Sequence, residues 1–108
     1  MRTEDLQRNA LGVSRGVAMD MEADGSGATR AYILECVRRF FRGDFGTIPP
    51  EDAAANLDEL EAGEGHALAH YPARHALRSD IYINAYSSAE DPGDADRNNT
   101  LVMYCDEY

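Results

Sequence analysis

The sequence predicts an α+β fold: a single small domain with the element order β-α-α-β-β-β, a mostly antiparallel sheet and two helices packed on one face. Residues 29–62 contain two segments with apolar residues at helical spacing, and residues 65–108 contain three short apolar runs separated by turn residues. A chain of 108 residues has room for one modest core. We expect a flexible N-terminus over residues 1–9 and the domain over residues 10–108.

The first expected element is a strand that begins at Ala10. The segment ALGVSRGVAM, residues 10–19, has Leu11, Val13 and Val17 in rough alternation with small or polar residues, which is typical of a strand. The acidic, glycine-containing DMEADGSG that follows indicates a turn or loop.

A helix is expected next, capped by Ser26 or Thr29 and running to about Arg42. Its apolar residues recur at helical spacing and form one stripe, made of Ile33, Leu34, Val37, Phe40 and Phe41. Its arginines lie largely off this stripe: Arg30, Arg38, Arg39 and Arg42. Because Gly43 tolerates the left-handed backbone that ends many helices, the helix is expected to stop there.

A second helix and three strands complete the predicted order. Pro50 suits the first position of a helix, and Gly63 marks its end. A narrow apolar face on this helix contains Ala53, Leu57 and Leu60. Between the helices, Phe45 is expected to point into the core. The segments HALAHYP, DIYINAYS and TLVMYC are predicted strands, separated by Pro72 and the loop SSAEDPGDADRNN.

Net charge is the strongest compositional signal. The chain has 20 acidic residues against 10 arginines and no lysine, for a net charge of −10. The imbalance lies in residues 43–108, which hold 14 acids and three arginines. Such a field repels nucleic acid and anionic membranes and attracts basic surfaces. We therefore expect a basic protein surface as partner, with no direct nucleic acid and no membrane contact; solubility alone is the other interpretation.

The expected location is the cytoplasm, because the sequence has neither an apolar N-terminal leader nor an apolar run long enough to span a membrane. Cys36 and Cys105 are then expected to be buried, reduced thiols. Oligomeric state stays open between monomer and homodimer, since exposed strand edges permit a dimer.

The motifs that suggest catalysis are incomplete. The DFG of residues 44–46 imitates a kinase element, but the chain has no lysine to pair the phosphates and is too short for a kinase. Its serines and cysteines lie in no recognised nucleophile motif. We expect no catalytic residue and no cofactor, and a small enzyme of unknown reaction is the weakest of the three function classes considered.

Metal sites are also not expected. Two segments imitate a calcium-binding loop, but their twelfth positions fall on Ala31 and Cys105, where a bidentate glutamate is required. His66 and His70 would share one face of a strand about 13 Å apart, which is too far for both to ligate one zinc ion.

The acidic residues themselves are the candidate partner-binding residues. Glu51 and Asp52 suit the positive N-terminus of the second helix, so helix stability explains them. Negative charge near the C-terminus of a helix instead costs about 0.3–1 kcal/mol per exposed residue. The full candidate set combines that helix with the bend before it and an acidic loop after it: Asp44, Glu51, Asp52, Asp58, Glu59, Glu61, Glu64, Glu90, Asp91, Asp94 and Asp96.

Over residues 10–108 the order of segments resembles a family of small accessory proteins of plasmids and phages. The matching residues are Gly43-Asp44-Phe45-Gly46, Glu51-Asp52 with Asn56, Gly63, Tyr71, Ile81-Tyr82-Ile83 and Glu107-Tyr108. The chain departs from the family in its loop SSAEDPGDADRNN, which is longer and more acidic than the usual polar or basic connection. The resemblance implies the fold and a mobile-element origin but no chemistry.

A small acidic protein on a mobile element is similar to anti-defence inhibitors, including the anti-CRISPR class, which commonly occupy a basic nucleic-acid channel. The leading hypothesis is therefore a non-enzymatic inhibitor that binds a basic surface of a bacterial defence complex, such as a CRISPR surveillance-complex subunit, and blocks target binding. The alternative is a plasmid or phage accessory module that binds a protein through the arginine-rich face of the first helix.

Overall fold

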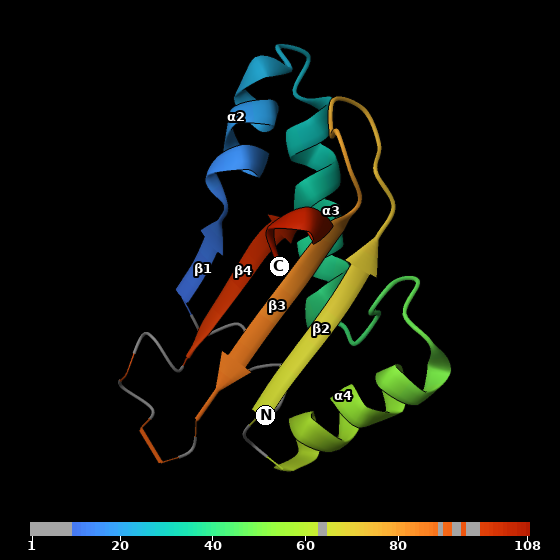
Figure 1. The fold of residues 1–108 in the computed structure, drawn as a ribbon, viewed down its shortest axis with the longest axis vertical. Coiled ribbons are helices and arrows are strands. Elements are labelled where there is room, and N and C mark those ends of the chain that lie inside the picture. The colour runs from blue at the N-terminus through green and yellow to red at the C-terminus, as the bar shows by residue number, and fades with distance from the viewer. Residues whose placement is uncertain (1–9, 63–64, 89, 92–93, 95–97) are drawn as a thin grey trace.

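The structure, a computed structural model, describes residues 10–62, 65–88, 90–91, 94 and 98–108, with the backbone alone described for residues 10 and 60–62 (Figure 1). The expected flexible segment 1–9 lies outside these residues. The elements are β1 (Ala10–Val13), α2 (Arg15–Ala23), α3 (Ala28–Phe41), α4 (Pro50–Ala62), β2 (Gly65–Tyr71), β3 (Ile81–Ser87), β4 (Asn99–Tyr104) and the 3₁₀ helix η1 (Cys105–Glu107).

The predicted α+β fold class is confirmed. Among the described residues, the sheet has four strands in the order β1-β4-β3-β2. β3 runs antiparallel to both of its neighbours, whereas β1 runs parallel to β4. In the register of β2 and β3, Gly65 lies opposite Ser87 and Tyr71 lies opposite Ile81. β1 and β4 can pair in parallel because the intervening elements supply the long crossover that such a pair requires.

One face of the sheet forms the hydrophobic core with α2 and α3, and Figure 1 shows α3 behind the strands. Side chains at alternate positions point to this face and are buried, as in Ile81, Ile83 and Ala85 of β3. The apolar stripe of α3 packs against them through Ile33, Val37 and Phe40. Phe45, just after α3, packs edge-to-face on Phe40 with ring centroids 5.7 Å apart, which confirms its expected inward position.

The expected strand over residues 10–19 is wrong beyond Val13, because the chain becomes the helix α2 at Arg15. The side chain of Ser14 accepts a hydrogen bond from the Val17 N–H at 3.3 Å and so acts as the N-cap. Val17 and Met21, four residues apart, are both buried in the core. α2 also contains the first part of the segment expected as a loop, so the fold has one helix more than the predicted order.

The start of α3 depends on Asp24 together with Ser26, one of the two expected caps, whose hydroxyl oxygen accepts the Ala28 N–H at 3.2 Å. Thr29, the other expected cap, lies inside the helix. The helix begins at Ala28, after Gly27 in the left-handed region with a φ of 79°. One carboxylate oxygen of Asp24 accepts the N–H and hydroxyl of Ser26 at 3.0 and 2.6 Å. The other accepts the N–H and hydroxyl of Thr29 at 2.9 and 2.6 Å. These bonds, those from Ser26 foremost, hold the pKa of Asp24 below its usual range.

The outer edge of β2 is closed by the two segments that precede it in the chain. The Thr47 N–H donates to the His70 carbonyl at 2.8 Å, and the His70 N–H donates to the Phe45 carbonyl at 3.1 Å. Gly46 adopts a φ of 75° at this crossing, where a Cβ would collide with the His70 carbonyl oxygen. The bend between α3 and α4 therefore pairs with β2 as a short parallel bridge.

Asn56 of α4 closes the same edge two residues earlier in the strand. Its side-chain amide donates to the Leu68 carbonyl at 2.9 Å, and its side-chain oxygen accepts the Leu68 N–H at 3.3 Å. Asn56 is buried, whereas Leu57, which was expected on the apolar face of this helix, is 49% exposed. A polar side chain thus fastens α4 to the sheet and satisfies backbone groups that an open edge would expose.

We expect Asn56→Ala to lower the free energy of unfolding by about 1–3 kcal/mol, because the Leu68 N–H and carbonyl lose their partners. Urea unfolding followed by circular dichroism measures the change. Leu57→Ala is the neighbouring control, expected to change stability by about 0.5 kcal/mol or less. Equal effects of the two substitutions would contradict the role given to Asn56.

Asp24 should make the free energy of unfolding depend on pH. Comparing the parent with Asp24→Asn at several pH values isolates this contribution. Because the folded-state pKa of Asp24 is lowered, its stabilisation is present above the unfolded value of about 3.9 and is lost as pH falls through the folded value. The parent should exceed the variant in stability by a constant amount above about pH 5, with the difference shrinking in acid. A difference that does not change between neutral and strongly acid solution would contradict this.

Candidate functional site

α4 presents carboxylates to solvent at both of its ends. Glu51, Asp52 and Asp58 are exposed, whereas Glu59 is half-buried and takes part in an interaction within the chain. The helix contains no basic residue, so nothing within it offsets the charge near its negative C-terminal end. Two other acids predicted to bind the partner lie outside the described part of the structure: the side chain of Glu61 and all of Glu64.

The second acidic segment is the loop between β3 and β4, where Glu90, Asp91 and Asp94 are exposed and Asp96 lies outside the described residues. Asn98 organises this loop: its amide donates to the carbonyls of Asp91 at 2.8 Å and Asp94 at 2.9 Å, and its oxygen accepts the Ser88 N–H at 3.0 Å. The Asn98 side chain therefore holds the loop through its backbone groups, while the side chains of Glu90, Asp91 and Asp94 are exposed.

The C-terminal end of α4 and the start of this loop lie toward the same end of the sheet. α4 leads into Gly65 at the start of β2, and Gly65 pairs with Ser87, the last residue of β3, after which the acidic loop begins. In Figure 1, the C-terminal end of α4 and the described part of this loop lie near the lower end of the strands. The fold thus places the C-terminal end of the acidic helix and the acidic loop toward the same end of the sheet, an arrangement that the sequence did not indicate.

Asp44, by contrast, is occupied within its own chain. It accepts hydrogen bonds from the Arg39 guanidinium at 2.7 and 3.3 Å and from the Gly46 N–H at 3.1 Å. The Arg39 bond foremost lowers the pKa of the Asp44 carboxyl. The Asp44 carbonyl accepts the Tyr71 hydroxyl at 2.6 Å. Asp44 therefore holds the bend after α3 against β2.

The arginines at the C-terminal end of α3 are also paired. Arg38 and Arg42 both form ion pairs with Glu35, at 3.7 and 3.4 Å, and their side chains are 64% exposed. Arg39 pairs with Asp44 and also lies over the ring of Tyr71, 4.9 Å from its centroid. These internal partners partly neutralise the arginine-rich face on which the alternative function depends.

A hydroxyl, an imidazole and a carboxylate form a connected chain beside the edge of β2. The Thr47 Oγ1 lies 2.5 Å from the His70 Nδ1, and the His70 Nε2 lies 3.0 Å from the Asp80 Oδ2. Nucleophilic catalysis also needs donors for a developing oxyanion. The neighbouring N–H groups of Gly46 and Thr47 already donate to Asp44 and His70. The observed contacts are therefore those of a structural tie.

The two cysteines differ in position. Cys36 is buried in the core as expected, whereas Cys105 is half-buried at the start of η1 and not within a strand. Burial raises the pKa of both thiols, which favours the protonated form over the nucleophilic thiolate.

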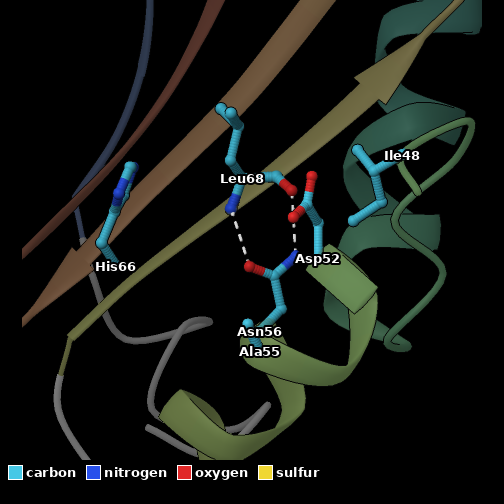
Figure 2. A pocket seen from close by; sticks show the side chains of 6 residues that line it. All are labelled: Ile48, Asp52, Ala55, Asn56, His66 and Leu68. Atoms are coloured by element: carbon cyan, nitrogen blue, oxygen red, sulfur yellow. Dashed lines mark hydrogen bonds between the residues drawn. The ribbon is translucent and has the colours of Figure 1, made fainter. Parts of the chain in front are cut away.

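A shallow pocket of about 200 Å³ lies between α4 and the face of the sheet opposite the core. It is lined by Ile48, Asp52, Ala55, Asn56, His66 and Leu68 (Figure 2). In Figure 2, Ile48 and His66 lie at opposite ends, with Asp52, Asn56 and Leu68 between them. His66 hydrogen-bonds the Asn84 side chain and stacks on Tyr86, with centroids 4.4 Å apart and planes 7° apart.

Within the described part of the chain, no group of three or more His, Cys, Asp or Glu side chains is arranged to hold a metal ion. In the same ranges, each helix falls short of the length and apolar character that crossing a bilayer demands.

Comparison with known proteins gave no significant match to any family model, to any curated protein or to any solved structure.

Proposed function

We propose that this protein is a non-enzymatic acidic inhibitor that binds a basic, nucleic-acid-handling protein surface through α4 and the β3–β4 loop. In its finer form, the proposal is an anti-defence protein of a phage or plasmid, of the anti-CRISPR type, that acts in the cytoplasm of the bacterial host. By covering the basic surface of a surveillance complex, it would keep target nucleic acid from binding.

The observation that supports the proposal is that the C-terminal end of α4 and the acidic loop lie toward the same end of the sheet. Asp58 near the end of α4 is exposed, as are Glu90, Asp91 and Asp94 in the loop. Arg97 is the only base in these segments. Concentrated negative charge steers association with a positively charged surface and disfavours nucleic acid itself. The carboxylates near the C-terminus of α4 oppose the helix dipole, so a gain in helix stability does not explain them.

The resemblance of residues 10–108 to plasmid and phage accessory proteins supports the finer form. It suggests a mobile-element origin, for which a bacterial defence complex is a natural opponent. Asp44 is left out of the proposed surface, because Arg39 and Gly46 occupy its carboxylate.

The experiment measures displacement of fluorescent target DNA from purified CRISPR surveillance complexes of several types. We expect the parent protein to displace DNA from at least one type, and less effectively at high salt, because screening weakens steered association. The triple variant Glu51→Gln, Asp52→Asn, Asp58→Asn should associate about tenfold more slowly or worse. Circular dichroism confirms that the variant remains folded.

Matched controls separate location from total charge. Asp58→Asn and Glu22→Gln each remove one exposed carboxylate, but only the first lies on the proposed surface. We expect the first to slow association more than the second. Replacing Arg38 and Arg42 by Gln should leave inhibition unchanged, and a loss there would favour the alternative module. If the parent displaces DNA from no complex, or the triple variant matches the parent, the proposal is wrong.

A further inference from the structure

The pocket beside α4 combines three apolar walls with one carboxylate. Ile48, Ala55 and Leu68 supply the apolar surface, and Asp52 is the only charged side chain among the lining residues besides a histidine. Asp52 is exposed, and no side-chain ion pair within the described residues engages it. The pocket therefore offers a ligand apolar walls and one carboxylate, that of Asp52, at its rim.

The polar groups deeper in the pocket are already used. Both ends of the Asn56 amide bond the Leu68 backbone, and the Nε2 of His66 bonds Asn84. A ligand that relied on several hydrogen bonds would have to break these contacts. A ligand with an apolar stem and one charged end would leave them intact.

The size of the pocket limits its ligand to a small group. Pockets for drug-sized molecules measure roughly 300–1,000 Å³, whereas this one measures about 200 Å³. Long basic side chains match it chemically, because their methylene stems pack on apolar surface while their charged ends stay near water. Of lysine and arginine, arginine fits better, because its planar guanidinium can donate two parallel hydrogen bonds to a carboxylate and can stack on an aromatic ring.

We propose that this pocket receives an arginine side chain of the partner, with its stem against Ile48, Ala55 and Leu68 and its guanidinium on Asp52. The inference rests on the proposed function, since it assumes a partner with a basic surface, and it assigns that surface a specific anchor. His66, whose ring is held in place by Tyr86, closes the far end of the pocket.

The test uses the isolated ligand group, N-acetyl-arginine amide, titrated into the ¹⁵N-labelled full chain and followed by NMR. We expect saturable shifts at the amides of residues 52, 55, 56, 66 and 68, with a dissociation constant on the order of millimolar. N-acetyl-citrulline amide has nearly the same shape without the charge, and it should bind about tenfold more weakly or not at all.

Three substitutions sharpen the test. Asp52→Asn should weaken binding about tenfold, because it removes the anion that meets the guanidinium. Glu22→Gln also removes one exposed carboxylate, but on α2 and outside the pocket, so it should leave binding of the arginine amide unchanged. Ala55→Met, which keeps a good helix former while filling the pocket, should abolish binding without unfolding the protein.

The outcomes separate this inference from the proposed function. If the arginine amide causes no localised shifts, or citrulline binds equally well, the arginine pocket is wrong. The inhibitor proposal would still stand in that case if the parent displaces DNA from a surveillance complex. If the pocket binds the arginine amide but no complex is inhibited, the proposed function fails while the pocket itself is confirmed.

Discussion

The backbone hydrogen bonds along the outer edge of β2 are the constraint on which the rest of the structure depends. β2 is an edge strand of the sheet, so its outward N–H and carbonyl groups need partners from outside the sheet. The bend after α3 satisfies His70, and Asn56 satisfies Leu68. These two attachments fix where α4 lies. A single polar side chain and a glycine bend thus place the acidic helix that the proposed function uses.

This mode of attachment leaves most of α4 exposed. A helix that packed through a broad apolar stripe would bury one side. Among the side chains described in α4, those of residues 50–59, Asn56 is buried and Ala53 and Glu59 are partly buried. The other side chains described in this helix face solvent, and the helix contains no base to balance their charge. Each exposed acid near the C-terminal end of the helix lowers helix stability by about 0.3–1 kcal/mol, because its charge opposes the helix dipole. A role in binding explains why such acids are present, whereas a role in stability does not.

Sequence reasoning recovered what local patterns determine. The alternating strands of residues 65–104, the stripe of α3 and the inward turn of Phe45 all follow from the periodicity of apolar residues and from glycine positions. It missed α2 because Val13 and Val17 are consistent with both strand alternation and helical spacing, and the capping role of Ser14 was the signal that could have decided between them. It also could not foresee the role of Asn56, because no local pattern shows which distant backbone groups a buried amide will meet.

The candidate site was predictable in its residues but not in its arrangement. The acids were named from composition and from the helix dipole. That the C-terminal end of α4 and the acidic loop lie toward the same end of the sheet depends on the pairing of Gly65 with Ser87, a long-range contact. Asp44 carried the same charge in the sequence, yet the fold pairs it with Arg39. Charge patterns therefore identify candidates, and only tertiary contacts separate the acids that face solvent from those that hold the fold.

Native-state hydrogen exchange at the Leu68 amide tests the central structural claim most directly. In a four-stranded sheet without α4 attached, this outward-facing amide of an edge strand would exchange freely. Bonded to Asn56, it should show protection in the parent and lose it in Asn56→Ala, while the His70 amide stays protected by its bond to Phe45. Free exchange of Leu68 in the parent would contradict the attachment of α4 and, with it, the placement of the acidic surface.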